Sequence, residues 1–142
     1  PNVVGLPPTH GVIFDLLNKL KKNPKVLHVL GDGSQNKSYL HVDDLIDGMI
    51  FLNDIPLKKN DNPIFNLGVN NDSVNVKWLA EEVVRQFAPK AKIIYGESNK
   101  GWIGDIPKFT YNTSKAIDYG WIPKLDSKQA VSRAIKEIIN NI

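Results

Sequence analysis

The chain has 142 residues, of which 42% are hydrophobic and 23% are charged, a balance typical of one globular domain. It contains no cysteine, which excludes disulfides, thiolate metal sites and a thiol nucleophile. The net charge of +3 is too small to indicate a nucleic-acid-binding surface, and no apolar run reaches the ~18 residues of a membrane span. With no visible signal peptide, this composition favours a cytoplasmic protein.

The first part of the chain alternates segments of helical and extended periodicity. The predicted elements are a helix over residues 12–22, a strand over 26–30, a strand over 38–42 and a helix over about 44–53. Asn23-Pro24 ends the first helix, because proline has no backbone N–H to donate. The glycine-containing connection between the two strands predicts a hairpin-like turn, and Asp43 or Asp44 can cap the second helix.

The second part begins with a polar loop over residues 54–62. The elements predicted after it are a strand over 64–68, a helix over about 76–88, a strand over 92–95, a long loop over 96–110, a short helix over 113–119 and a last helix from Asp126 or Ser127. Asn75 caps the helix over 76–88, and Gly120 closes the short helix. Helices interleaved with short strands indicate an α/β or α+β domain.

Two short motifs suggest cofactor binding or catalysis, and both have simpler interpretations. Gly31-Asp32-Gly33 contains the first two glycines of a dinucleotide-binding fingerprint, but it joins two predicted strands rather than a strand and a helix. Tyr111 and Lys115 have the Tyr-x-x-x-Lys spacing of short-chain dehydrogenases, but that pair needs a cofactor domain before it in the chain. We therefore interpret the first as a turn and the second as a helix start with Lys115 on the surface.

The sequence indicates neither a metal site nor a catalytic residue. Its three histidines lack the spacing of metal ligands. The acids Asp43, Asp44 and Asp47 suggest a cation site, but a helix cap and a favourable contact with the helix dipole explain two of them.

A longer series of motifs is more specific because of its order and spacing. It consists of Asn2-Val3-Val4-Gly5, His10-Gly11-Val12-Ile13, the segment 27–33, Gln35-Asn36-Lys37-Ser38-Tyr39, His41-Val42-Asp43-Asp44, Phe65-Asn66-Leu67-Gly68, the segment 101–107 and Gly120-Trp121. This series resembles the C-terminal half of extended short-chain dehydrogenase/reductases. Within that superfamily it is most similar to NAD-dependent nucleotide-sugar epimerases and dehydratases of the UDP-glucose 4-epimerase type.

The resemblance implies a two-part enzyme of which this chain is the second part. In that family an N-terminal Rossmann domain binds NAD, and a smaller C-terminal lobe binds the nucleotide sugar. NAD takes a hydride from C4 of the sugar, a Tyr-x-x-x-Lys pair moves the proton, and in an epimerase the hydride returns to the other face. Those catalytic residues would precede Pro1, so residues 1–142 are predicted to be a substrate-binding fragment, inactive by itself. The alternatives are a fragment of a nucleotide-sugar 4,6-dehydratase and a non-catalytic nucleotide-sugar binding module.

The resemblance also assigns substrate-binding residues one by one. His10 and Gly11 match positions where a loop and a helix start contact the phosphate and the sugar. The strand with His28 matches the strand beside the base, and Leu30 stands where many relatives have an aromatic residue. Lys37 matches an arginine that binds the diphosphate; lysine keeps the charge but loses the bidentate geometry.

Three further positions lie in the predicted long loop. Asp105 matches an acid that hydrogen-bonds the ribose or the base. Trp102 occupies the place of a common arginine, and Lys100 can substitute for that arginine at the phosphate. This departure leaves the nucleotide open, so the resemblance implies a UDP- or dTDP-hexose as ligand.

The resemblance finally implies uncovered apolar surface. The helix after Asp43 and the strand over 64–68 would return to the Rossmann domain, and their apolar residues would lack part of their cover. These residues are Leu45, Ile46, Met49, Phe51, Phe65 and Leu67. Exposed apolar patches promote association, so we expect the isolated chain to self-associate and the full-length enzyme to be a homodimer.

Overall fold

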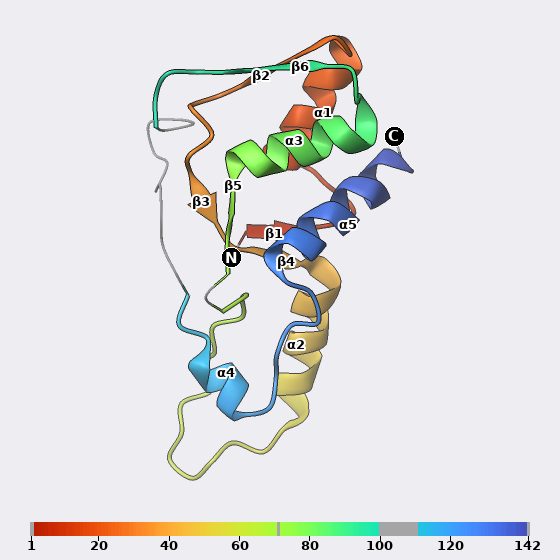
Figure 1. Ribbon diagram of the computed structural model, residues 1–142. Helices are drawn as coiled ribbons and strands as arrows, with labels where there is room; N and C mark the ends of the chain where they lie inside the picture. The colour runs from red at the N-terminus through yellow and green to blue at the C-terminus, as the bar shows by residue number, and fades with distance from the viewer. Residues whose placement is uncertain (1, 71, 100–110, 142) are drawn as a thin grey trace.

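The computed structural model describes residues 2–70, 72–99 and 111–141. The helices are α1 (Val12–Lys22), α2 (Val42–Asp54), α3 (Val76–Phe87), α4 (Ser114–Asp118) and α5 (Ser127–Ile139). The strands are β1 (Asn2–Val4), β2 (Val26–Val29), β3 (Asn36–Lys37), β4 (Tyr39–His41), β5 (Val74–Asn75) and β6 (Lys92–Tyr95). Figure 1 shows α1, α3, β2 and β6 at one end of the molecule, α2 and α4 at the other, and α5 with β1 and β4 between them.

The strands of the described residues form three two-stranded pairs rather than one sheet. β1 pairs with β4 and β2 with β6, both in parallel, whereas β3 pairs with β5 in antiparallel orientation. All of these partners are distant in the sequence. The mixed helices and strands confirm the α/β class that the sequence predicts.

The predicted hairpin-like turn is wrong, because the two strands that flank residues 31–36 pair elsewhere in the described part of the chain. Gly31 and Gly33 have φ of 76° and 82°, a region that favours glycine, and they turn the chain away from β2. The Asp32 N–H donates to the carbonyl of Ser98 at 2.7 Å, and the Gly96 N–H donates to the carbonyl of Gly31 at 2.8 Å. The turn is therefore joined to the segment after β6 and not to β4.

Three amphipathic helices confirm their predictions closely. α1, α3 and α5 lie within one residue of the predicted ranges, and Asn75 caps α3 by accepting the Trp78 N–H at 2.7 Å. Asp126 caps α5 in a capping box with Gln129, in which each side chain accepts the other residue's backbone N–H. Local side-chain chemistry is sufficient to define the starts of α3 and α5.

Two other predictions need correction. α2 begins at Val42, and its N-cap is His41 rather than Asp43 or Asp44, because the His41 Nδ1 accepts the Asp43 N–H at 3.2 Å. Residues 64–68 form no strand in the structure. That segment lacks a ladder partner among the described residues, and its short apolar pattern alone does not supply one.

The main core lies where α1, α3 and α5 meet the β2–β6 and β4 strands. Its fully buried side chains include Leu16, Leu17, Leu20, Leu27, Leu79, Val83, Val131 and Ile135. Each fully buried leucine contributes ~2 kcal/mol through the hydrophobic effect. Tyr39 of β4 is buried in this core at 4% exposure.

A smaller core joins α2, α4 and the segment before α5. Its buried members are Leu40, Val69, Ala116 and Trp121, and Gly48 of α2 lies against the Trp121 ring. The opposite face of α2 carries exposed Ile46, Met49 and Ile50. Among the described residues, no helix has the length and apolar character needed to cross a membrane.

Candidate functional site

A groove of about 680 Å³ runs between the N-terminal segment and the strands that follow α1. One wall is residues 2–16, which include β1, the proline-containing loop and the start of α1. The other wall comes from the segment between β2 and α2. Four of the predicted substrate-binding residues line this groove together: His10, Gly11, Leu30 and Lys37.

The first wall presents the N-terminus of α1 to the groove. Gly11 is the N-cap of this helix of 11 residues, and no described side chain caps its first backbone N–H groups. Unpaired N–H groups and the positive end of the helix dipole favour an anion at this position. The acid in the first turn, Asp15, is neutralised by Lys19 at 2.7 Å.

The second wall carries a cation and an apolar side chain. Lys37 belongs to β3, which is held in place by its antiparallel pairing with β5, where Lys37 lies opposite Val74. Leu30 follows β2 and is 63% exposed. The groove therefore combines a helix N-terminus, a lysine and an apolar surface.

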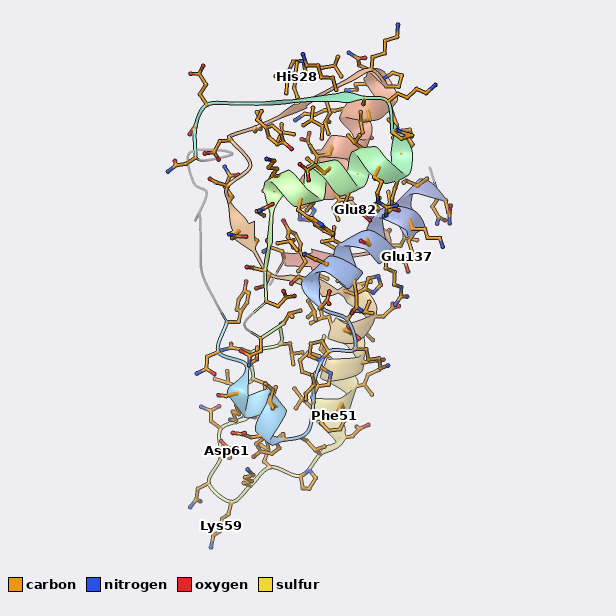
Figure 2. All side chains as sticks on the ribbon, viewed as in Figure 1. His28, Phe51, Lys59, Asp61, Glu82 and Glu137 are labelled. Carbon is orange, nitrogen blue, oxygen red and sulfur yellow. The ribbon has the colours of Figure 1, made fainter. Side chains whose placement is uncertain are left out.

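The remaining predicted positions lie apart from this groove or outside the described residues. His28 is exposed on the side of β2 opposite to buried Leu27 and Val29, and it does not line the groove. Figure 2 shows it at the end of the molecule formed by β2 and β6. Lys100, Trp102 and Asp105 lie outside the described residues.

The sequence interpretation did not assign Gln35 to the site. Gln35 lines the groove two residues before Lys37 and is only 2% exposed. Neither its amide nitrogen nor its amide oxygen has a hydrogen-bond partner in the described part of the chain. Polar character alone does not reveal burial, so only the structure identifies this side chain as unusual.

Lys115 of the Tyr111–Lys115 pair has a structural role in this fold. The Lys115 Nζ forms an ion pair with Asp61 Oδ1 at 2.9 Å, and Tyr119 donates its hydroxyl to the other oxygen of Asp61. Hydrogen bonds from Tyr119 and Lys115 lower the pKa of Asp61 to about 2. Burial raises the pKa of Tyr111, whereas a catalytic tyrosine base needs a lowered one.

One cluster has the geometry of a metal site. His41, Asp43 and Glu137 place possible ligand atoms within 4.8 Å of one another. However, Arg133 pairs with both carboxylates, and the His41 Nε2 lies 3.1 Å from Glu137 Oε2. These contacts join the start of α2 to α5, so the cluster already has a structural explanation.

Comparison with known proteins identifies the relatives of this chain. Residues 1–68 match the sequence profile described as "NAD dependent epimerase/dehydratase family". A crystal structure of UDP-galactose 4-epimerase matches 99% of this chain and 44% of its own chain, with a TM-score of 0.77 and 30% identity. This chain belongs to the NAD-dependent epimerase/dehydratase family.

Curated relatives from a plant extend the comparison. UDP-glucuronic acid decarboxylase 1 of Arabidopsis thaliana is 31% identical over 125 residues, which are 87% of this chain and 26% of that protein. GDP-L-fucose synthase 1 of the same plant is 28% identical over 119 residues, which are 80% of this chain and 33% of that protein. The chain thus spans a third or less of the length of these relatives.

Proposed function

We propose that the groove binds the nucleoside diphosphate part of a nucleotide sugar. The observation that carries this proposal is the convergence of His10, Gly11, Leu30 and Lys37 on one groove from separate segments. The groove volume of about 680 Å³ lies within the usual range for small-molecule sites. The family resemblance and the groove geometry agree on these four residues, and this agreement supports the proposal.

Each wall has a defined part in this proposal. The N-terminal N–H groups of α1 and the Lys37 ammonium bind the diphosphate, which carries negative charge at neutral pH. Leu30 offers an apolar contact to the base. His10 lies beside the helix start, with its Nδ1 at 2.8 Å from the Thr9 hydroxyl, and it contacts the phosphate or the sugar.

In the same proposal, residues 1–142 are the substrate-binding region of an NAD-dependent, UDP-glucose 4-epimerase-like enzyme of the cytoplasm. When bound, NAD accepts a hydride from C4 of the sugar and returns it. This chain's Gly31-Asp32-Gly33 turn does not fit NAD, because its backbone is joined to the segment after β6. NAD is then held mainly by an N-terminal domain, and the chain alone positions the substrate without turnover.

In a second candidate function, the same groove binds the nucleotide sugar but the enzyme catalyses a different reaction. The relatives of this chain include proteins named as a decarboxylase and as a GDP-L-fucose synthase. A structure named as dTDP-glucose 4,6-dehydratase of Bacillus anthracis shares the fold, with a TM-score of 0.73. A nucleotide-sugar 4,6-dehydratase and a binding module without chemistry are therefore the alternatives for residues 1–142. Assay of the full-length protein with UDP-glucose and with dTDP-glucose separates these reactions by their products.

Lys37→Ala is expected to weaken UDP-glucose binding about tenfold, because it removes a charge-assisted contact to the diphosphate. Isothermal titration calorimetry of the chain measures this loss, which we expect to shrink at high salt. Lys59→Ala is the matched control, since Lys59 is an exposed lysine in the loop after α2 (Figure 2). Equal effects of the two substitutions, or no binding of UDP-glucose by the unaltered chain, would contradict the proposal.

The exposed face of α2 is expected to make the isolated chain self-associate. Ile46, Met49 and Ile50 are 48%, 59% and 58% exposed, and they lie on one helix face. Analytical ultracentrifugation should show concentration-dependent oligomers for the unaltered chain and a shift towards monomer for Ile46→Lys/Ile50→Lys. A monodisperse monomer at all concentrations would show that this face does not drive association.

A further inference from the structure

Gln35 is a buried polar side chain whose hydrogen-bonding groups are unused. It is 2% exposed, and both polar atoms of its carboxamide lack partners among the described residues. Native proteins pair nearly all such groups, so an unpaired carboxamide in a groove wall indicates a partner that arrives from outside the chain. Its backbone is firmly held, since the Gln35 carbonyl accepts the Val76 N–H at 3.0 Å.

The position of Gln35 specifies which part of a ligand it can reach. Gln35 immediately precedes β3, and it lines the groove together with Leu30 and Lys37. With the base at Leu30 and the diphosphate at Lys37, the ribose of the nucleotide lies between these two contacts, in the groove whose wall contains Gln35.

We propose that the Gln35 carboxamide hydrogen-bonds the ribose hydroxyls of the bound nucleotide; this inference rests on the proposed function of the groove. A carboxamide offers one acceptor oxygen and two N–H donors, and a vicinal diol offers both donors and acceptors. The two groups can therefore pair at two points. Neither amide atom contacts water in this conformation, so binding requires a small movement of the groove wall.

The first test compares two nucleotides on two proteins by calorimetry. The unaltered chain should bind uridine diphosphate at least tenfold more tightly than 2′,3′-dideoxyuridine diphosphate. Gln35→Met, which keeps the length of the side chain and removes its polar atoms, should bind both nucleotides equally. An unchanged preference in this variant would overturn the inference, whereas failure of uridine diphosphate to bind the unaltered chain would overturn the proposed function.

The second test separates ligand contact from a role in folding. Replacement of an unpaired carboxamide by an apolar group should leave the thermal midpoint of the free chain unchanged or raise it. A lowered midpoint for Gln35→Met would reveal an internal partner and overturn the inference.

NMR spectroscopy of the unaltered chain tests the contact directly. The side-chain N–H₂ resonances of Gln35 should shift when uridine diphosphate is added and shift less when the dideoxy nucleotide is added. Equal shifts with the two nucleotides would count against ribose contact.

Discussion

Gly48→Ala is expected to destabilise the protein by about 2 kcal/mol, although alanine is the better helix former. A Cβ atom at position 48 would lie 2.6, 2.8 and 2.9 Å from Cε2, Cζ2 and Nε1 of Trp121. The ring is 6% exposed and packs in the small core with Leu40, Val69 and Ala116, so it has little room to move. The overpacking cost therefore exceeds the gain of ~1 kcal/mol in helix propensity.

Chemical denaturation with both proteins at one pH measures this difference in unfolding free energy. Ile50→Ala is the control in the same helix, because Ile50 is 58% exposed and its replacement should change stability little. In a Trp121→Phe background, which lacks the indole atoms nearest to Gly48, the cost of Gly48→Ala should fall. A stabilising effect of Gly48→Ala would show that the ring moves freely.

Glu82→Gln is expected to cost about 2 kcal/mol of unfolding free energy at pH 7. Glu82 is 8% exposed and connects α3 to α5 (Figure 2). Its Oε1 accepts hydrogen bonds from the Arg85 guanidinium at 2.7 Å, the Gln86 amide at 2.7 Å and the Ser132 hydroxyl at 2.9 Å. A neutral amide keeps the shape but loses the charge that strengthens these bonds.

The effect of Glu82→Gln should depend on pH in a defined direction. Hydrogen bonds from Arg85 lower the pKa of Glu82 from 4.5 to about 2, against the opposing effect of burial. A carboxyl with a lowered pKa in the folded state contributes its full stability above pH 4.5, and that contribution is lost as the pH falls towards 2. The difference between the two proteins should therefore be constant near neutral pH and shrink below pH 4.5.

Denaturation at several pH values between 2 and 7 measures this profile. Glu81→Gln is the matched control, because Glu81 is the exposed neighbour of Glu82 in α3. Both substitutions remove one negative charge. If the difference in unfolding free energy between the unaltered protein and Glu82→Gln stays constant down to pH 2, the charge of Glu82 does not have the stabilising role assigned to it.

The structure differs from the sequence-based expectation mainly where contacts are long-range. The start of α2 illustrates this. Asp43 and Asp44 satisfy the local rule for a cap, but His41 is the residue that caps the helix, because its ring is buried and also contacts Glu137 of α5. A capping rule that uses only neighbouring residues does not include a contact between residues 96 positions apart in the sequence.

In the candidate site, too, the sequence predicts some features and only the tertiary structure shows the others. The motif series around Lys37 predicts which residues bind a nucleotide, and four of those residues do line one groove. Two features come only from the tertiary structure: His28 is exposed and does not line the groove, and Gln35 is buried in the groove wall without a partner among the described residues. Alternation along a short strand gives two faces but does not say which one is covered.

The sequence by itself determined α1, α3 and α5, together with the caps Asn75 and Asp126, because these depend on periodicity and side chains within one helical turn. It also determined the family, since ordered motifs persist where overall identity is low. Only the tertiary structure decided how β1, β2 and β3 pair, because each partner strand is far away in the sequence and backbone hydrogen bonds do not depend on side-chain identity. The groove follows from that pairing, which brings the start of α1 to the strand of Lys37.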